Sequence, residues 1–139
     1  MGSSLASASC FFYLILFNIF KNYLITKGIK KEQIIEIKLD LLSQNHLRDP
    51  FKMLAFIKEK INNKQKFFVL IEEIQMCNNF VELLNELINY SNLDVYVTGS
   101  NSRMLSKDIL TEFRGRGDEI NLKPLSFSEI YYQLKNSQF

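Results

Sequence analysis

Two adjacent carboxylates follow an apolar run near the middle of the chain. In the segment KFFVLIEEIQ, residues 66–75, Glu72 and Glu73 come directly after five apolar residues and precede Ile74. A carboxylate in apolar surroundings costs free energy unless hydrogen bonds, an opposite charge or a metal ion compensates it. The pair therefore predicts either a site with such a partner or an ordinary strand end that lies in solvent.

A second polar segment, TGSNS at residues 98–102, follows another apolar run, LDVYV. If both runs are neighbouring parallel strands, the acids and these small polar side chains meet at the carboxyl edge of one sheet, where ligands bind in such folds. Oxygen ligands at that edge suit magnesium and phosphate. A simple turn remains the alternative for residues 98–102, because Gly, Ser and Asn favour turns.

Strands and helices alternate along the chain. Period-two and apolar runs predict strands, and three- to four-residue spacing of apolar side chains predicts helices. The alternation predicts an α/β fold, a mostly parallel sheet with helices on both faces. The expected strands are 33–40, 66–73, 93–100 and 118–126, and the expected helices are 11–27, 49–62, 79–90, 102–115 and 126–135.

Composition excludes several classes of site. The chain has 139 residues and a net charge of +2, too small to indicate nucleic-acid binding by itself. Its one histidine, His46, lies in a polar segment and is expected in solvent. Cys10 and Cys77 form no CxxC pair, so neither a disulfide framework nor a zinc site is predicted.

The first residues, MGSSLASAS, predict no structural element, and we expect residues 1–10 to be disordered or tag-like. The apolar run that follows has no preceding Lys or Arg and is interrupted by Asn18, Lys21 and Asn22. It therefore predicts a buried helix ended by Gly28 rather than a signal peptide or a membrane span. A cytoplasmic protein without a membrane partner is expected.

Four segments in order resemble one family. FFVLIEEIQ, VYVTGSNSRML, EFRGRGDEI and KPLSFSEIY closely resemble the archaeal and bacterial AAA-type ATPases of the AAA+ P-loop superfamily. The resemblance runs from about Leu16 to Tyr132 and makes residues 11–139 a partial domain of this kind. It implies a three-layer P-loop NTPase-like fold, with ATP and Mg²⁺ as cofactors.

The resemblance also implies roles for particular residues. Glu72 would stand at the magnesium side of the Walker B segment, where the family usually has Asp, and Glu73 would be the base that orients the attacking water. Ser100 or Asn101 would be the first sensor of the γ-phosphate.

Arg114 or Arg116 would be an arginine finger that reaches the nucleotide of a neighbouring subunit, which implies a homo-oligomer or an intact paralogue as partner. Solvated charges at a helix end are the alternative for these arginines.

The phosphate-binding loop of that family, GxxxxGK[ST], does not occur in the sequence. There is no glycine between Gly2 and Gly28, and the first lysine is Lys21. Without the loop there is neither a glycine-rich nest nor a lysine for the phosphates. Residues 1–9 also supply no strand before the loop, so the central first strand of the family is expected to be missing.

Two functions follow from these observations. The first is an ATP-binding and ATP-hydrolysing AAA-type domain whose activity is expected to be impaired in this chain. The second is a non-catalytic protein-interaction remnant of such an ATPase. Nucleic-acid binding rests only on scattered lysines and is not expected as a direct activity.

Overall fold

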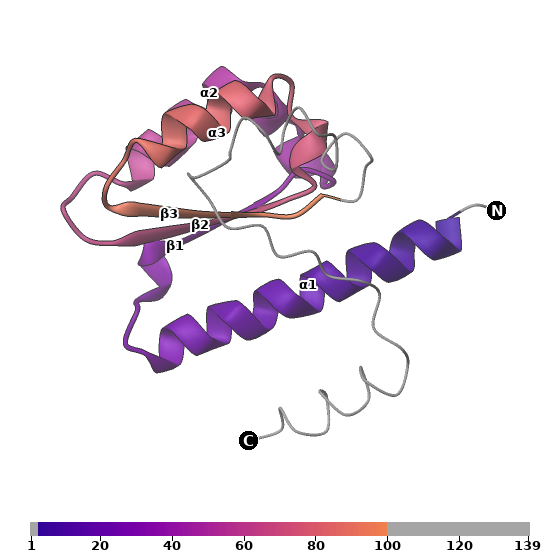
Figure 1. The fold of residues 1–139 in the computed structure, drawn as a ribbon, viewed down its shortest axis with the longest axis horizontal. Helices are drawn as coiled ribbons and strands as arrows, with labels where there is room; N and C mark the ends of the chain where they lie inside the picture. Colours follow the sequence, from indigo (N-terminus) through magenta and orange to yellow (C-terminus); the bar gives the residue numbers. More distant parts are fainter. Residues whose placement is uncertain (1–2, 100–139) are drawn as a thin grey trace.

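The described part of the chain is built around a parallel sheet. The computed structural model describes residues 3–99 and, of the side chains, those of residues 15–99. Three parallel strands, in the order β1-β2-β3, form one sheet with β2 at its centre (Figure 1). The strands are β1 Ile34–Lys38, β2 Phe67–Glu72 and β3 Leu93–Val97.

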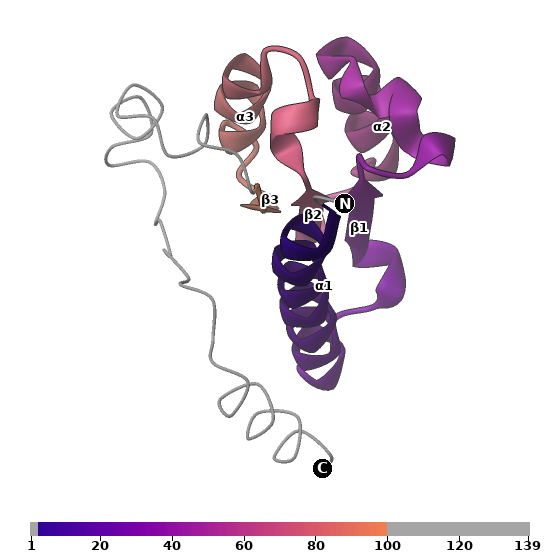
Figure 2. The ribbon, with the colours of Figure 1, turned by 90° about the vertical axis from the view of Figure 1, so that its right-hand side faces the viewer.

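Helices cover both faces of this sheet. The α-helices are α1 Ser3–Thr26, α2 Pro50–Lys60 and α3 Phe80–Ile88. Figures 1 and 2 show α1 on one face and α2 with α3 on the other. The predicted α/β fold with three layers is therefore confirmed for the described residues. Short 3-10 helices occupy Lys31–Gln33, Leu42–Arg48 and Ile74–Met76.

Side-chain alternation along β2 divides the core in two. All of β2 is buried, as expected for the central strand of a sheet that is covered on both faces. Val69 and Ile71 belong to the core under α2 and α3, together with Met53, Ile57 and other buried residues of those helices. Phe68 and Leu70 point to the opposite face because successive side chains alternate. Glu72 continues this second series.

The helix α1 packs on the face that carries Phe68, Leu70 and Glu72. Its Phe17 and Leu24 are buried. The ring of Phe20 lies 4.6 Å from that of Tyr96 on β3, and Lys21 pairs with Glu36 on β1 at 2.9 Å. These contacts fix α1 across all three strands.

The helix α1 begins earlier than predicted. It starts at Ser3, eight residues before residue 11, so residues 3–10 are helical rather than without structure. A formed helix gains one hydrogen bond for each residue it adds, and Ala6 and Ala8 extend it at little cost. The division of the chain at residue 10 stays a prediction.

The predicted end of α1 at Gly28 is confirmed. Gly28 has a φ of 91°. Its N–H donates to the Ile25 carbonyl at 3.0 Å, and the N–H of Ile29 donates to the Leu24 carbonyl at 3.1 Å. This is the Schellman arrangement, which needs a left-handed residue and favours glycine. It turns the chain from α1 toward β1.

The other described elements match the sequence prediction within a few residues. The first three expected strands and the helices 49–62 and 79–90 are present. The expected loss of the central first strand stays a prediction, because α1 already begins at the first described residue, Ser3. The predicted elements at 102–115, 118–126 and 126–135 lie outside the described residues. No helix in the described range is long and apolar enough to span a membrane.

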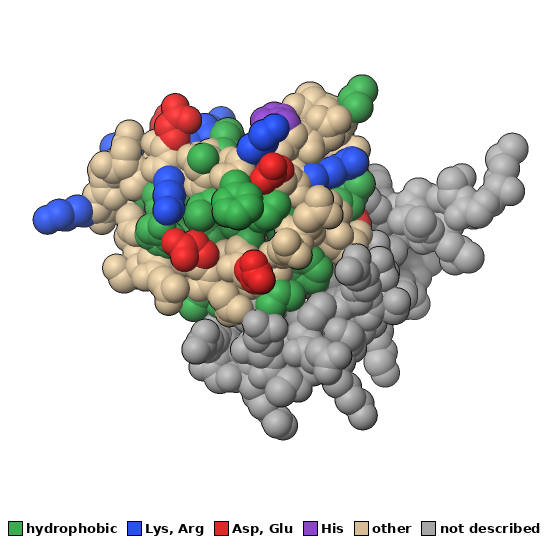
Figure 3. Space-filling model, turned by 90° about the horizontal axis from the view of Figure 1, so that it is seen from above, with side chains coloured by type: hydrophobic (Ala, Val, Ile, Leu, Met, Phe, Trp, Pro, Cys, Tyr) green, Lys and Arg blue, Asp and Glu red, His purple; other side chains and the backbone are tan. Residues whose placement is uncertain are grey.

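The surface over α2 and α3 carries charges of both signs. Figure 3 shows Lys and Arg side chains interspersed with Asp and Glu around an apolar centre. Lys58 lies over the ring of Tyr90, 5.8 Å from its centroid, and 3.9 Å from Glu86. His46 is exposed, as predicted.

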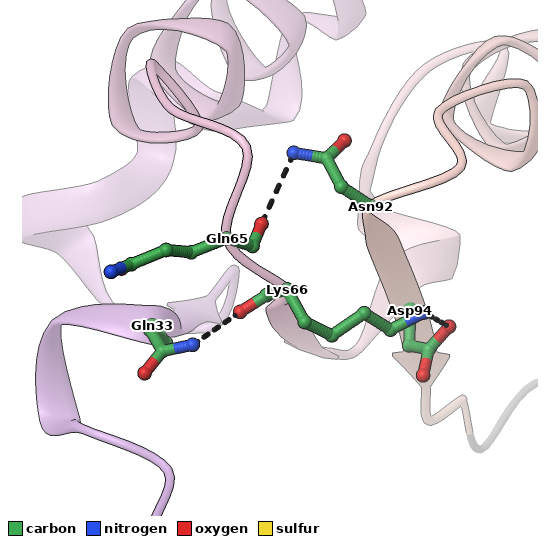
Figure 4. Close-up of polar contacts among 5 residues, drawn as sticks. All are labelled: Gln33, Gln65, Lys66, Asn92 and Asp94. Atoms are coloured by element: carbon green, nitrogen blue, oxygen red, sulfur yellow. Dashed lines mark hydrogen bonds and ion pairs between the residues drawn. The ribbon is translucent and has the colours of Figure 1, made fainter.

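A set of polar contacts joins the three strands at their amino ends (Figure 4). The amide of Gln33 donates to the Lys66 carbonyl at 2.7 Å, and Lys66 pairs with Asp94 at 2.7 Å. The amide of Asn92 donates to the Gln65 carbonyl at 3.2 Å. These contacts help to hold the register that aligns the carboxyl ends of the strands at the opposite edge.

The start of α2 gives a direct test of this local structure. The Asp49 carboxylate caps the helix by accepting the N–H of Phe51 at 2.9 Å, and Pro50 occupies the first position. Asp49→Ala should lower the free energy of unfolding in urea by about 1 kcal/mol. Asp49→Asn keeps the cap and should cost much less. An equal loss in both variants would contradict the capping role.

Candidate functional site

The two acids lie at the carboxyl end of the central strand. Glu72 is the last residue of β2, and Glu73 follows it directly. Each is only 8% exposed. The alternative that the pair is an ordinary solvated strand end is therefore wrong. These acids, with Thr98, are the buried polar or charged residues among those described.

Glu72 stands in a crowded acidic setting on the α1 face. Burial raises the pKa of its carboxyl above the ordinary value of 4.5, while nearby Lys38 acts in the opposite direction. Lys38 is the residue that pairs with Glu72 in the register of β1 and β2. Asp40, Glu36 and Glu73 raise the pKa further. A cation bound near Glu72 would relieve both the desolvation and the repulsion.

Glu73 is held in an unusual backbone conformation. Its φ of 58° and ψ of 48° lie in the left-handed region. Asn79 is the other described non-glycine residue with positive φ, but Asn tolerates this region far better than Glu does. The conformation costs a residue such as Glu about 1–2 kcal/mol. Strain of this kind clusters at functional sites.

Thr98, which follows β3, fixes the strained turn. Its hydroxyl accepts the N–H of Glu73 at 3.4 Å, and its carbonyl accepts the N–H of Ile74 at 2.9 Å. The N–H of Thr98 donates to the Ile71 carbonyl at 2.9 Å. Three contacts thus join the ends of β2 and β3 beside the acid pair.

Gln75 contacts the side chain of Glu73. Its Nε2 donates a short hydrogen bond to Oε2 of that carboxylate. The contact is possible because the 3-10 helix Ile74–Met76 folds the chain back over the strand end, closed by the N–H of Met76 donating to the Glu73 carbonyl at 2.9 Å. The position of the Glu73 carboxylate is therefore set by a neighbouring side chain as well as by the backbone.

The structure brings together only part of the predicted site. Glu72 and Glu73 lie side by side at the predicted edge, next to the end of β3. The predicted sensor residues Ser100 and Asn101 and the predicted arginine fingers Arg114 and Arg116 lie outside the described residues.

Sequence reasoning missed Thr98 and Gln75. The sequence prediction for residues 98–102 names Ser100 and Asn101, although Thr98 is the residue that directly follows the strand. For Gln75 the sequence shows only a polar side chain two residues after Glu73. That side chain can contact Glu73 only if the chain turns back after the strand.

Glu72 fits a magnesium ion in the chemistry of its ligand atoms. Mg²⁺ takes carboxylate oxygens, commonly one or two from the protein with water and phosphate completing the shell. Among residues 3–99 no group of three His, Cys, Asp or Glu side chains is arranged to hold a metal. The described residues could therefore supply part of a magnesium site that a nucleotide phosphate completes.

The helix α1 runs past the edge of the sheet at which nucleotide phosphates bind in such folds (Figure 1). Nucleotide phosphates bind at a helix N-terminus beside the carboxyl ends of the strands. Because α1 starts at Ser3, its N-terminus lies about 12 Å beyond residue 11, at a rise of 1.5 Å per residue.

Comparison with known families identifies the domain. A family model described as "AAA domain" matches residues 14–131, most of the chain. The chain belongs to this AAA domain family. The match begins inside α1 and its range includes both acids, and the α/β fold is that of an AAA domain. Nucleotide and Mg²⁺ binding are general properties of AAA domains.

Two longer proteins are similar to this AAA domain. One is an uncharacterized protein of Haemophilus influenzae, 32% identical over 114 residues that cover 81% of this chain and 28% of that protein. The other is an uncharacterized protein of Methanocaldococcus jannaschii, 33% identical over 126 residues that cover 91% of this chain and 26% of that protein. The chain thus spans about a quarter of either relative. A search of solved structures found no match.

Substitution of Glu73 tests the strain in the turn. Glycine adopts positive φ without the Cβ penalty. The free energy of unfolding of Glu73→Gly should therefore be about 1 kcal/mol higher than that of Glu73→Ala. Exposed Glu82 in α3 is the matched control, where Ala should be more stable than Gly by about 1 kcal/mol. Urea unfolding of the four variants would measure this reversal. The same order at both positions would contradict the strained conformation.

The raised pKa of Glu72 predicts how stability depends on pH. Between pH 4.5 and the higher folded-state pKa, the folded chain binds more protons at Glu72 than the unfolded chain does. The contribution of Glu72 to the free energy of unfolding therefore falls as pH rises through this window. Glu72→Gln removes that contribution, so its stability relative to the wild type should increase from pH 4.5 to pH 7.

The control for this pH series is Glu59→Gln, at an exposed position of α2. Its stability relative to the wild type should change less with pH than that of Glu72→Gln. A difference between Glu72→Gln and the wild type that stays constant, or shrinks with rising pH, would contradict the assignment.

Proposed function

We propose that the acid pair is the magnesium and water side of an ATP-hydrolysing site in this AAA domain. The observation that carries the proposal is the buried, left-handed Glu73 at the carboxyl end of the central strand. The fold keeps a carboxylate where glycine would be less strained and where burial is costly. A role for the carboxylate itself explains why both costs are borne at one residue.

The two acids have different proposed roles. Glu72 would hold Mg²⁺, which would offset negative charge on the phosphates when bound. Glu73 orients a water whose oxygen attacks the γ-phosphorus. The bond from this phosphorus to the β–γ bridging oxygen breaks, ADP leaves, and the water proton passes to Glu73.

The remaining roles are proposed from the family resemblance. Ser100 or Asn101 senses the γ-phosphate, and Arg114 or Arg116 acts on the nucleotide of a neighbouring subunit. A finger in trans requires a homo-oligomer or an intact paralogue. The mixed charges over α2 and α3 favour a protein partner over nucleic acid on that face (Figure 3). A cytoplasmic location remains a prediction.

Hydrolysis by this chain alone is expected to be poor. The loop GxxxxGK[ST] does not occur in the sequence, and α1 continues as helix through the place where the loop would lie. The backbone N–H groups of a helix interior are bonded within the helix and cannot bind phosphate. We therefore expect residues 1–139 alone to bind the nucleotide weakly.

Phosphate release from the purified chain tests this proposal. At millimolar Mg-ATP we expect less than about 0.1 turnover per second, roughly a hundredth of a typical enzyme rate. Glu73→Gln is the test variant, and Glu59→Gln on α2 is its matched control. Ordinary turnover that Glu73→Gln abolishes and Glu59→Gln preserves would contradict the expected impairment.

Binding separates the ATPase proposal from the interaction remnant. If the acids form half of a nucleotide site, weak binding of Mg-ATP should require Glu72 and magnesium, and it should be lost in Glu72→Gln. A protein that copurifies with a partner chain and shows no Glu72-dependent binding of Mg-ATP would favour the non-catalytic alternative.

A further inference from the structure

The side-chain amide of Gln75 is satisfied at one end only. Its Nε2 donates to the Glu73 carboxylate. Its Oε1 is buried and accepts no hydrogen bond from the described residues. The amide is oriented with its NH₂ group toward the carboxylate, because the carboxylate oxygen accepts this hydrogen bond and an amide oxygen cannot donate one. The atom without a partner is thus a hydrogen-bond acceptor, and its partner must be a hydrogen-bond donor.

An unsatisfied buried acceptor is unusual in a folded protein. In a protein interior, an acceptor left without any partner costs about 1–3 kcal/mol, so a buried acceptor that lacks a protein donor is commonly bonded to an ordered water or ion. The same turn already carries the strain of Glu73. Two unfavourable features therefore coincide around one carboxylate.

We propose that Gln75 Oε1 and the Glu73 carboxylate together bind the attacking water through its two hydrogens. This inference rests on the proposed ATPase function and adds Gln75 to the site as a water-binding residue. The two acceptors are neighbours because the other end of the same amide is bonded to that carboxylate. Water is the smallest donor with two protons, and a water held by both leaves an oxygen lone pair directed away from them.

The backbone around the two acceptors favours a fixed water position. Thr98 holds the N–H groups of Glu73 and Ile74, and the 3-10 helix that follows holds Gln75 above the strand end. A water bound by groups that are already fixed needs little further ordering before it reacts. Glu73 would accept the proton on attack, and Gln75 would keep the water aligned without exchanging a proton.

The test is to locate this water in the full 139-residue chain. A crystal structure that resolves ordered waters, supported in solution by water–protein nuclear Overhauser effects, would be measured for the wild type and Gln75→Met. Methionine has nearly the length of glutamine but neither an amide donor nor an amide acceptor. Gln65→Met is the matched control, because the side chain of Gln65 points away from its neighbours in Figure 4.

We expect a water about 2.7–3.2 Å from both Gln75 Oε1 and a Glu73 oxygen in the wild type. It should be lost in Gln75→Met and retained in Gln65→Met. A wild-type structure without this water, or with a protein donor on Oε1, would overturn the inference even if Gln75→Met failed to fold. A water that persists in Gln75→Met would overturn the part assigned to Gln75.

These outcomes are separate from those of the nucleotide assays. If the water is not found, the result of the Mg-ATP binding assay with Glu72→Gln still stands. A Gln75-dependent water in a chain whose Mg-ATP binding does not need Glu72 would contradict the ATPase proposal, while the water site itself would stand.

Discussion

The burial of two carboxylates at the end of the central strand is the constraint on which the rest of the site depends. Glu72 and Glu73 are nearly excluded from solvent, and burial opposes the ionised form of Glu72. Neighbouring groups offset part of this cost: Lys38 lies in register with Glu72 and opposes the rise of its pKa, and Thr98 and Gln75 form hydrogen bonds with Glu73. These contacts are incomplete, since the pKa of Glu72 remains raised and Gln75 Oε1 remains unsatisfied. Magnesium and water would complete both.

The two sides of the proposed site differ in this chain. On the acid side, the parallel strands, the strained turn and its hydrogen bonds all fit the proposed binding of magnesium and water. On the phosphate side, α1 is continuous from Ser3, and at 1.5 Å per residue it is about 36 Å long against about 20 Å for β2. The helix therefore extends past the strand ends instead of beginning beside them. Nucleotide sites of AAA domains have both an acid side and a phosphate side, whereas residues 3–99 of this chain supply only the acids.

Much of the fold could be predicted because the patterns are local. The apolar runs of β2 and β3, the Asp-Pro start of α2 and Gly28 at the end of α1 each specify an element through their own residues. The start of α1 could not be predicted, because small polar residues permit a helix without indicating one. The position of the acids followed from strand direction. The left-handed Glu73 and its contact with Gln75 did not, because they depend on how β3 and the following turn pack against the strand end.

Locating a divalent cation in the protein tests the proposed role of the acid pair most directly. Mn²⁺ replaces Mg²⁺ at oxygen sites and gives an anomalous X-ray signal that marks its position. Crystals of the chain grown with millimolar Mn²⁺ and a non-hydrolysable ATP analogue should show a peak within bonding distance of a Glu72 carboxylate oxygen, about 2–2.5 Å, with phosphate on its far side. A manganese and nucleotide bound elsewhere, with Glu72 contacting neither, would contradict the claim that the buried acids are the magnesium side of an ATP site.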